Sequence, residues 1–148
     1  MKKVMAIASG GGHWVQLLRL RPAFSHHDVT FVSTNSDYAK DVNAKFHCVL
    51  DANMWDKWAL FKMFMQVLWL VIKARPDVVI TTGAAPGFAA VFFGRVIGAR
   101  TIWVDSIANS EQLSQSGSHA GKFVNVWLTQ WEHLSDEKNG LNVWGSVL

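Results

Sequence analysis

Short apolar segments alternate with longer helical segments along the whole chain. The short segments are rich in β-branched and other apolar residues, as expected of buried strands. The sequence predicts strands at 4–8, 29–33, 45–50, 77–81, 100–105, 123–129 and 142–144. It predicts helices at 13–20, 55–74 and 87–97. This alternation is typical of a Rossmann-like α/β fold, in which a parallel sheet carries helices on both faces.

The composition suits one domain over residues 1–148 and narrows the possible functions. Half of the 148 residues are hydrophobic and 17% are charged, which is a globular composition rather than a disordered one. The net charge is +3, but no run of Lys or Arg forms the basic stripe of a nucleic-acid binder. No apolar run reaches the ~18–20 residues that cross a bilayer, so no membrane-spanning segment is expected.

The cysteine and histidine residues indicate no disulfide, metal site or cofactor. Cys48 is the single cysteine, and its apolar surroundings predict a buried side chain. His26 and His27 are adjacent and are expected in a surface loop. Because no spacing typical of metal ligands occurs, we expect no catalytic metal.

A glycine-rich turn connects the first predicted strand to the first predicted helix. Ser9, Gly10, Gly11 and Gly12 precede His13. Glycines let the backbone approach a ligand, and a helix N-terminus offers free N–H groups with a partial positive charge. An anion such as a diphosphate could therefore bind here. A tight turn that binds no ligand is the alternative.

His13 begins this helix at the carboxyl end of a strand, where open α/β sheets bind ligands. A histidine there could accept a proton from an acceptor hydroxyl near neutral pH, or it could hold the loop by hydrogen bonds. The helix is expected to face the core with Val15 and Leu18, and Trp14 is a further candidate. Val15 stands where the dinucleotide-binding fingerprint has its third glycine, so that fingerprint is absent.

A second strand–glycine loop–helix junction contains Gly83 and Gly87. If its strand neighbours the first one, the two junctions would form a single crevice that favours anions. An ordinary loop between strand and helix is the alternative. Gly87, Ala90 and Gly94 also form a stripe of small residues, which permits close packing of the helix on the sheet.

Asp105 and Ser106 end another predicted strand and are expected at the same edge of the sheet. Asp105 could accept a hydrogen bond from a sugar hydroxyl or orient a base. It could also cap the next turn, which is the commoner role of Asp and Ser.

The predicted helix at 55–74 combines tryptophan and lysine on one face. At 100° per residue, one side carries Leu60, Phe64, Val67, Leu68 and Val71, and it should pack on the sheet. The other side carries Trp55, Trp58, Lys62, Gln66, Trp69 and Lys73. Indole rings beside ammonium groups suit the headgroup layer of a membrane. Contact with a partner protein, or burial with the lysines reaching solvent, is the alternative.

Five short segments occur in an order and spacing that carry a family resemblance. They lie at 9–13, 83–87, 103–106, 113–117 and 128–131. The last two, Leu-Ser-Gln-Ser-Gly and Leu-Thr-Gln-Trp, are the most specific, because general α/β physics does not require them. In these segments the chain resembles Alg14-like proteins, whose bacterial relatives are exopolysaccharide and capsule glycosyltransferase subunits of PssD and CpsF type. Where the family commonly has Glu-Ser, this chain has Asp105-Ser106.

The resemblance implies one half of a split GT-B glycosyltransferase, equivalent to the N-terminal domain of the single-chain enzyme MurG. This half would bind a polyprenyl-diphosphate-linked acceptor, while an Alg13-like partner binds most of the UDP-sugar. The acceptor hydroxyl would attack the anomeric carbon with inversion, with His13 as general base and Asp105 as a less favoured participant. Substrate binding would fall to Ser9, Gly10, Gly11, Gly12, Gly83, Gly87 and Ser106.

The same resemblance implies a peripheral protein on the cytoplasmic face of a membrane, in bacteria the inner membrane. Attachment would then come from the 55–74 helix, since no membrane-spanning anchor is expected. Two other functions remain open. One is a non-catalytic membrane adaptor that recruits and activates the catalytic subunit, and the other is a stand-alone nucleotide-binding protein of flavodoxin-like shape.

Overall fold

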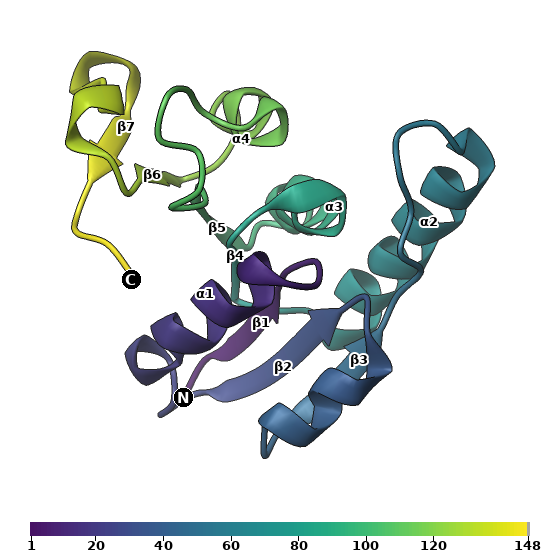
Figure 1. The fold of residues 1–148 in the computed structure, drawn as a ribbon. Coiled ribbons are helices and arrows are strands. Elements are labelled where there is room, and N and C mark those ends of the chain that lie inside the picture. Colours follow the sequence, from purple (N-terminus) through teal and green to yellow (C-terminus); the bar gives the residue numbers. More distant parts are fainter. Residues whose placement is uncertain (148) are drawn as a thin grey trace.

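The computed structural model describes residues 1–147 and contains one parallel sheet of seven strands, in the order β3-β2-β1-β4-β5-β6-β7 (Figure 1). The strands are β1 (Lys3–Ile7), β2 (Asp28–Ser33), β3 (Lys45–Cys48), β4 (Val78–Thr81), β5 (Arg100–Val104), β6 (Val126–Thr129) and β7 (Leu141–Val143). The helices are α1 (Gly12–Leu20), α2 (Lys57–Ala74), α3 (Ala84–Val96) and α4 (Gln115–Ala120). This is the predicted Rossmann-like fold. A flavodoxin-like shape is wrong, because that fold places β2 at the edge and β3 beyond β1.

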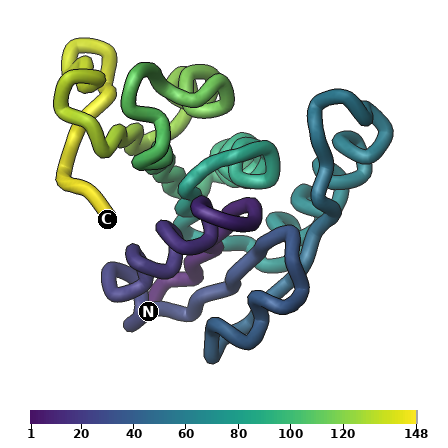
Figure 2. Tube along the Cα trace, viewed as in Figure 1, coloured from purple at the N-terminus to yellow at the C-terminus, as the bar shows by residue number. Residues whose placement is uncertain are grey.

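The helices cover both faces of the sheet, and the chain winds between the two layers as Figure 2 shows. Alternate residues of β1 divide between two cores, as the pleat of a strand requires. Val4 and Ala6 lie with α1 in one core, and Met5 and Ile7 lie with α2 and α3 in the other. Burial of both faces explains why the central strands have continuous apolar sequences.

The inward face of α1 differs from the prediction. Trp14 and Leu17 are buried, Leu18 is half-buried, and Val15 is 46% exposed. Tertiary packing sets this phase, because the Trp14 ring stacks on Tyr38 with centroids 4.9 Å apart. Tyr38 belongs to a short 3₁₀ helix, η2 (Ser36–Asp41), that periodicity did not predict.

The phase of α2 is also shifted from the prediction. Its buried residues are Met63, Val67, Leu70 and Val71. The predicted inward residues Leu60, Phe64 and Leu68 are only half-buried.

The ends of α2 are set by its capping residues. The Asp56 side chain caps the N-terminus by accepting from the Ala59 N–H at 3.0 Å. The helix ends at Arg75, whose φ of 45° is left-handed, and Pro76 follows.

Small residues let α3 approach the sheet, as predicted. A Cβ added to Gly87 would lie 2.0 Å from the Thr81 Oγ1, and one added to Gly94 would lie 2.7 Å from the Val79 Cγ2. The helix begins at Ala84, three residues earlier than predicted, since Pro86 is tolerated in a first turn.

Two further differences lie outside the central sheet. The polar region after β5, predicted as loop, contains the short α4, whose N-terminus is capped by the Ser114 hydroxyl. Cys48 was expected to be buried and is exposed, because β3 is the edge strand of the sheet.

Candidate functional site

The two glycine junctions meet at one point of the sheet. β1 pairs with β4 in parallel, and the chain runs outward from this pair in opposite directions. The carboxyl ends of β1 and β4 therefore form the topological switch point, where ligands bind in open α/β sheets. The β1–α1 turn and the β4–α3 turn both lie at this edge.

His13 and Thr82 tie the two junctions together. The His13 Nδ1 lies 2.9 Å from the Thr82 carbonyl oxygen, and the Thr82 hydroxyl donates to the His13 carbonyl oxygen at 2.6 Å. A carbonyl oxygen can only accept, so this contact places the imidazole proton on Nδ1. The Nε2 lone pair then remains available to accept a proton from a substrate.

Gly83 makes room for the imidazole ring. Its φ is 126°, and an added Cβ would lie 3.0 Å from the His13 Cε1. The Gly83 N–H donates to the Thr81 hydroxyl at 3.0 Å. A larger residue at this position would strain the backbone and displace the ring.

Part of the first glycine turn is already occupied by hydrogen bonds within the protein. The Gly10 N–H donates to the Thr34 hydroxyl at 3.2 Å, and the Gly11 N–H donates to the Tyr38 hydroxyl at 2.9 Å. The N–H groups of Gly12 and His13 lie in the first turn of α1, where a helix has no acceptor for them. In this turn, the first backbone N–H group that remains available to an anion is therefore that of Gly12. Ser9 is half-buried at the end of β1.

At the second junction, the backbone N–H groups that lack a helical partner belong to residues before Gly87 in the sequence. Ala84 and Ala85 occupy the first turn of α3, where N–H groups lack intrahelical partners. Gly87 is buried against Thr81 in the following turn. Gly87 therefore serves the packing of α3 on the sheet. The N–H groups available to an anion at this junction are those of Ala84 and Ala85.

Asp105 holds the loop that follows β5. Its buried carboxylate accepts from the Trp103 Nε1 at 3.0 Å, the Asn109 Nδ2 at 3.3 Å, the Ser114 N–H at 3.0 Å and the Ser114 hydroxyl at 2.6 Å. Four donors leave the carboxylate little capacity to accept from a substrate. The geometry therefore favours a structural role for Asp105, in the loop that follows β5, over contact with a sugar hydroxyl.

Ser106 takes part in a second buried polar group. Its hydroxyl accepts from the Gln16 Nε2 at 3.0 Å and from the Ala108 N–H at 3.2 Å. The Gln16 Oε1 in turn accepts from the Gln130 Nε2 at 2.7 Å, and that nitrogen also donates to the Asp105 carbonyl oxygen at 2.9 Å. These bonds link α1, β5 and the segment after β6.

The same loop is fixed at two more points. The Trp131 Nε1 donates to the Ile107 carbonyl oxygen at 2.7 Å, and the His133 Nε2 lies 2.5 Å from the Ser110 carbonyl oxygen. The segments around 103–106, 113–117 and 128–131, which carry the family resemblance, are thus parts of one network. That network shapes the rim of the sheet beside His13.

Thr82, Gln16 and Gln130 were missed by the sequence analysis. Gln16 gave no signal of burial, because glutamine in an amphipathic helix is usually exposed, whereas here its amide is buried and bonded to Ser106. Gln130 lies inside a segment already noted as specific. Thr82 gave no signal of its own, because its role depends on the pairing of β1 with β4.

The tryptophan and lysine face of α2 is exposed as predicted. Trp58 is 65% exposed and Trp69 57%, and Lys62 and Lys73 are exposed beside them. Trp55, predicted to begin the helix, lies in the turn before α2 and is 93% exposed. The Lys73 Nζ lies 4.5 Å from the Trp69 ring centroid, and the Lys62 Nζ lies 5.6 Å from that of Trp58. Other apolar side chains on α2 widen the exposed surface, namely Phe61, Met65 and Ile72.

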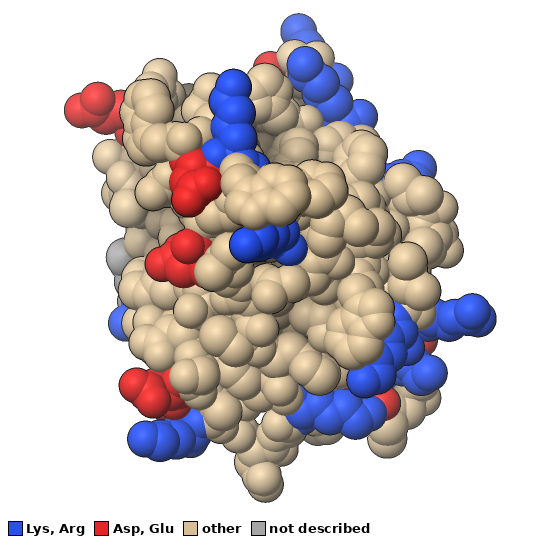
Figure 3. Space-filling model, turned by 90° about the vertical axis from the view of Figure 1, so that its right-hand side faces the viewer, with Lys and Arg blue, Asp and Glu red and all other residues tan. Residues whose placement is uncertain are grey.

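Figure 3 shows this side of the molecule as a largely uncharged surface, with Lys and Arg side chains and some Asp and Glu side chains on it and around its margin. Exposed apolar side chains gathered on one face are typical of interaction sites. An apolar pocket of 220 Å³ lies between the start of α2, α3 and α4, and its lining includes Met54, Phe64, Ala85 and Phe88. Ala85 belongs to the first turn of α3, so one side of this pocket lies at the second glycine junction.

No group of three or more His, Cys, Asp and Glu residues could hold a metal ion within residues 1–147. In the same range, no helix has both the length and the apolar character needed to cross a membrane.

Comparisons with known proteins support a family and a fold. The family model described as oligosaccharide biosynthesis protein Alg14 like matches residues 45–147. No curated protein sequence matches the chain. Among solved structures, MurG of Acinetobacter baumannii superimposes with a TM-score of 0.80 at 14% identity, over 99% of this chain and 46% of MurG.

Two other structures show the same architecture. The UDP-N-acetylglucosamine 2-epimerase of Rickettsia bellii has a TM-score of 0.74 at 18% identity, over 99% of this chain and 45% of the epimerase. The glycosyltransferase SsfS6 of Streptomyces sp. SF2575 has a TM-score of 0.56 at 16% identity, over 71% of this chain and 39% of SsfS6. The chain therefore spans less than half of each of these proteins, and its fold is that of a GT-B N-terminal domain.

Proposed function

Because this chain belongs to the family of Alg14-like oligosaccharide biosynthesis proteins, we propose that it is the acceptor-binding subunit of a two-component inverting glycosyltransferase. An Alg13-like partner binds most of the UDP-sugar. This chain binds a polyprenyl-diphosphate-linked saccharide of exopolysaccharide, capsule or lipid-linked oligosaccharide synthesis. The observation that carries the proposal is the position of His13 at the switch point, with Nδ1 held by Thr82 and Nε2 free to act as a base.

The proposed reaction needs one proton acceptor on this chain. The hydroxyl oxygen of the acceptor sugar attacks the anomeric carbon of the UDP-sugar, and the His13 Nε2 takes its proton. The bond from the anomeric carbon to the UDP oxygen breaks, and UDP leaves with the bonding electrons. Attack opposite to the leaving group inverts the configuration of the anomeric carbon.

The acceptor diphosphate would lie between the two helix N-termini at the rim. The N–H groups of Gly12 and His13 on α1, and of Ala84 and Ala85 on α3, are the donors available to it. Ser9 borders the same edge, and Gly83 keeps the His13 ring in place. The apolar pocket beside Ala85 suits the first part of the polyprenyl chain.

Attachment to the membrane would come from α2, as a peripheral contact on the cytoplasmic face of a bacterial inner membrane. Trp55, Trp58 and Trp69 would enter the interfacial layer, while Lys62 and Lys73 meet anionic headgroups. With α2 bound to the membrane in this way, the rim and its apolar pocket would lie close to the lipid-linked acceptor.

One observation favours the adaptor function instead. The Asp105 carboxylate accepts four hydrogen bonds within the fold and the Ser106 hydroxyl accepts two, so neither has much capacity left to accept from a substrate. In an adaptor, the partner would supply every catalytic group, and the network around Asp105 would shape a docking surface for it.

Substitution of His13 distinguishes these functions. His13→Ala in the reconstituted pair should lower the transfer rate by about 10²–10⁴-fold, the usual contribution of a general base. Complex formation and vesicle binding should persist, which serves as the control for folding. If transfer stays near the wild-type rate in such a complex, His13 is not the base and the adaptor function is favoured.

A further inference from the structure

A valley runs between α2 and the edge strand β3, away from the rim that carries His13. Its upper part, beside the carboxyl end of β3, is a groove of 560 Å³. The lining of this groove includes Phe61, Met65 and Trp69 on α2 and Cys48 on β3. Its lower part is a pocket of 360 Å³ near the amino ends of the strands. The two cavities share His47 and Leu70 in their linings, so they adjoin one another.

The lower pocket is built from residues that face α2 on three neighbouring strands. β1 contributes Lys3, β2 contributes Asp28 and Thr30, and β3 contributes Lys45 and His47. Register places Lys3 beside Asp28, and Thr30 beside Lys45. Because α2 leaves this corner of the sheet uncovered, polar side chains occupy a face that is apolar elsewhere.

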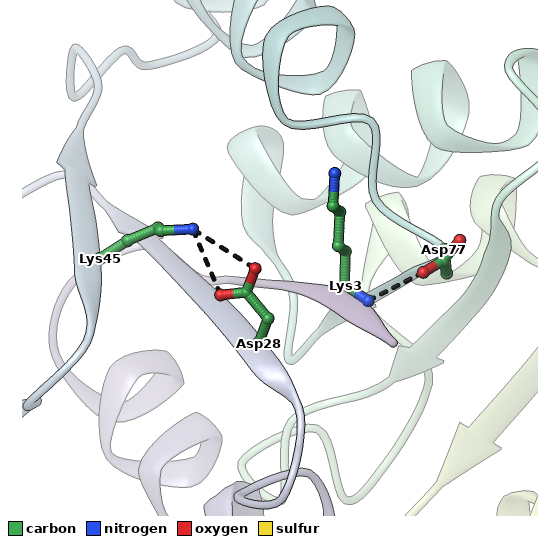
Figure 4. Close-up of polar contacts among 4 residues, drawn as sticks. All are labelled: Lys3, Asp28, Lys45 and Asp77. Carbon is green, nitrogen blue, oxygen red and sulfur yellow. Dashed lines mark hydrogen bonds and ion pairs between the residues drawn. The ribbon is translucent and has the colours of Figure 1, made fainter. Parts of the chain in front are cut away.

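The pocket has an excess of positive charge. Lys3, Lys45 and Lys73 line it, against the single carboxylate of Asp28. Lys45 pairs with Asp28 at 3.3 Å, which is the one ion pair found within residues 1–147. Figure 4 shows the Lys3 ammonium pointing away from both Asp28 and Asp77. The Asp77 carboxylate accepts a hydrogen bond from the Lys3 backbone N–H instead.

We propose that this valley binds one molecule of an anionic phospholipid. The headgroup phosphate would lie in the lower pocket beside the ammonium groups of Lys3 and Lys73. An acyl chain would lie in the upper groove, along Phe61, Met65 and Trp69. Charge complementarity selects the anion, and the adjoining apolar groove selects an amphiphile over a free phosphate.

This inference rests on the proposed membrane attachment through α2. With α2 on the bilayer surface, Trp69 lies in the interface and Lys73 at the headgroups, so the valley opens toward the lipid. The site would bind a lipid of the bilayer itself, and its headgroup pocket lies at the amino ends of the strands, opposite the edge of the sheet proposed for the lipid-linked acceptor.

The affinity test uses dihexanoyl-phosphatidylglycerol below its micelle concentration, titrated calorimetrically into the full chain. We expect one site per chain. Lys3→Gln should weaken binding about tenfold, since it removes a charged partner of the phosphate. Asp28→Asn should strengthen binding several-fold, because it removes the repelling carboxylate and frees the Lys45 ammonium.

Two exposed residues provide matched controls of equal charge change. Lys122→Gln and Asp37→Asn should each leave the affinity within about twofold, because both residues are exposed and neither lines the pocket or the groove. If they change the affinity as much as Lys3→Gln and Asp28→Asn do, binding follows net charge alone and the site is refuted. Failure of Asp28→Asn to strengthen binding refutes the pocket as well.

Cys48 reports whether a chain occupies the groove. Partial burial raises the pKa of its thiol, so alkylation is best followed in alkaline buffer. The phosphatidylglycerol probe should slow alkylation of Cys48 by N-ethylmaleimide, whereas inorganic phosphate should not. Equal binding of inorganic phosphate, without protection of Cys48, would show a free-phosphate site and refute the lipid. Neither result bears on His13, so the proposed transferase function is tested separately.

Discussion

His13 and Thr82 are joined by two reciprocal hydrogen bonds across 69 residues of sequence: the His13 Nδ1 donates to the Thr82 carbonyl oxygen at 2.9 Å, and the Thr82 hydroxyl donates to the His13 carbonyl oxygen at 2.6 Å. This pair fixes the β1–α1 turn against the β4–α3 turn. It also determines the tautomer of the imidazole, because the Thr82 carbonyl oxygen requires a proton on Nδ1. The orientation of the proposed base therefore depends on a neighbouring strand rather than on its own helix.

Loss of the Thr82 hydroxyl should impair transfer through His13. Thr82→Val retains the shape and the backbone carbonyl but removes the donor to the His13 carbonyl oxygen. We expect the transfer rate of the reconstituted pair to fall about tenfold, with a loss of about 1–2 kcal/mol in the free energy of unfolding. Thr82→Ser keeps the hydroxyl and should restore the rate. An unchanged rate in Thr82→Val would show that the bond does not position the imidazole.

Asp105 should matter mainly for stability. Asp105→Ala leaves the buried Trp103 indole and the Ser114 donors without their acceptor, so the free energy of unfolding should fall by about 2–4 kcal/mol. Urea denaturation measures this change. A variant that lost transfer while keeping the wild-type stability would instead place Asp105 in the reaction.

Gly87 should be required for packing. In Gly87→Ala the new Cβ would meet Thr81 Oγ1 at 2.0 Å, so we expect a loss of about 1–3 kcal/mol in stability. Gly12→Ala is the control, because nothing lies within 4 Å of a Cβ built there and α1 begins at that residue. Equal stability of the two variants would contradict the close approach of α3 to β4.

The exposed face of α2 should carry membrane binding. Trp58→Glu combined with Trp69→Glu should release the chain from anionic vesicles in a sedimentation assay, with the far-ultraviolet circular dichroism unchanged. Trp144→Glu is the matched control, since Trp144 is also exposed but lies after β7. Unchanged sedimentation of the double variant would show that α2 does not meet the membrane.

The sheet was predictable because buried parallel strands have a simple sequence signal. All seven predicted strands overlap observed ones, with ends that differ by up to three residues. The order of strands gave no such signal, yet it places His13 beside Thr82. Helix phase was harder to predict. The burial of Trp14 instead of Val15 depends on Tyr38, a residue of a 3₁₀ helix that has no periodic pattern.

The candidate site was predictable in position more than in detail. Glycine turns after two strands indicated the correct edge of the sheet. The hydrogen bonds that occupy Gly10, Gly11 and Asp105 could not be predicted, because their partners come from distant segments. Residues such as Gln130, grouped by family resemblance, proved to share one buried network.

The most direct test of the central claim is the rate of sugar transfer to a polyprenyl-diphosphate-linked acceptor by this chain alone, by its Alg13-like partner alone, and by the two together. The account predicts transfer by the pair and almost none by either component. Full activity of this chain without a partner would contradict it.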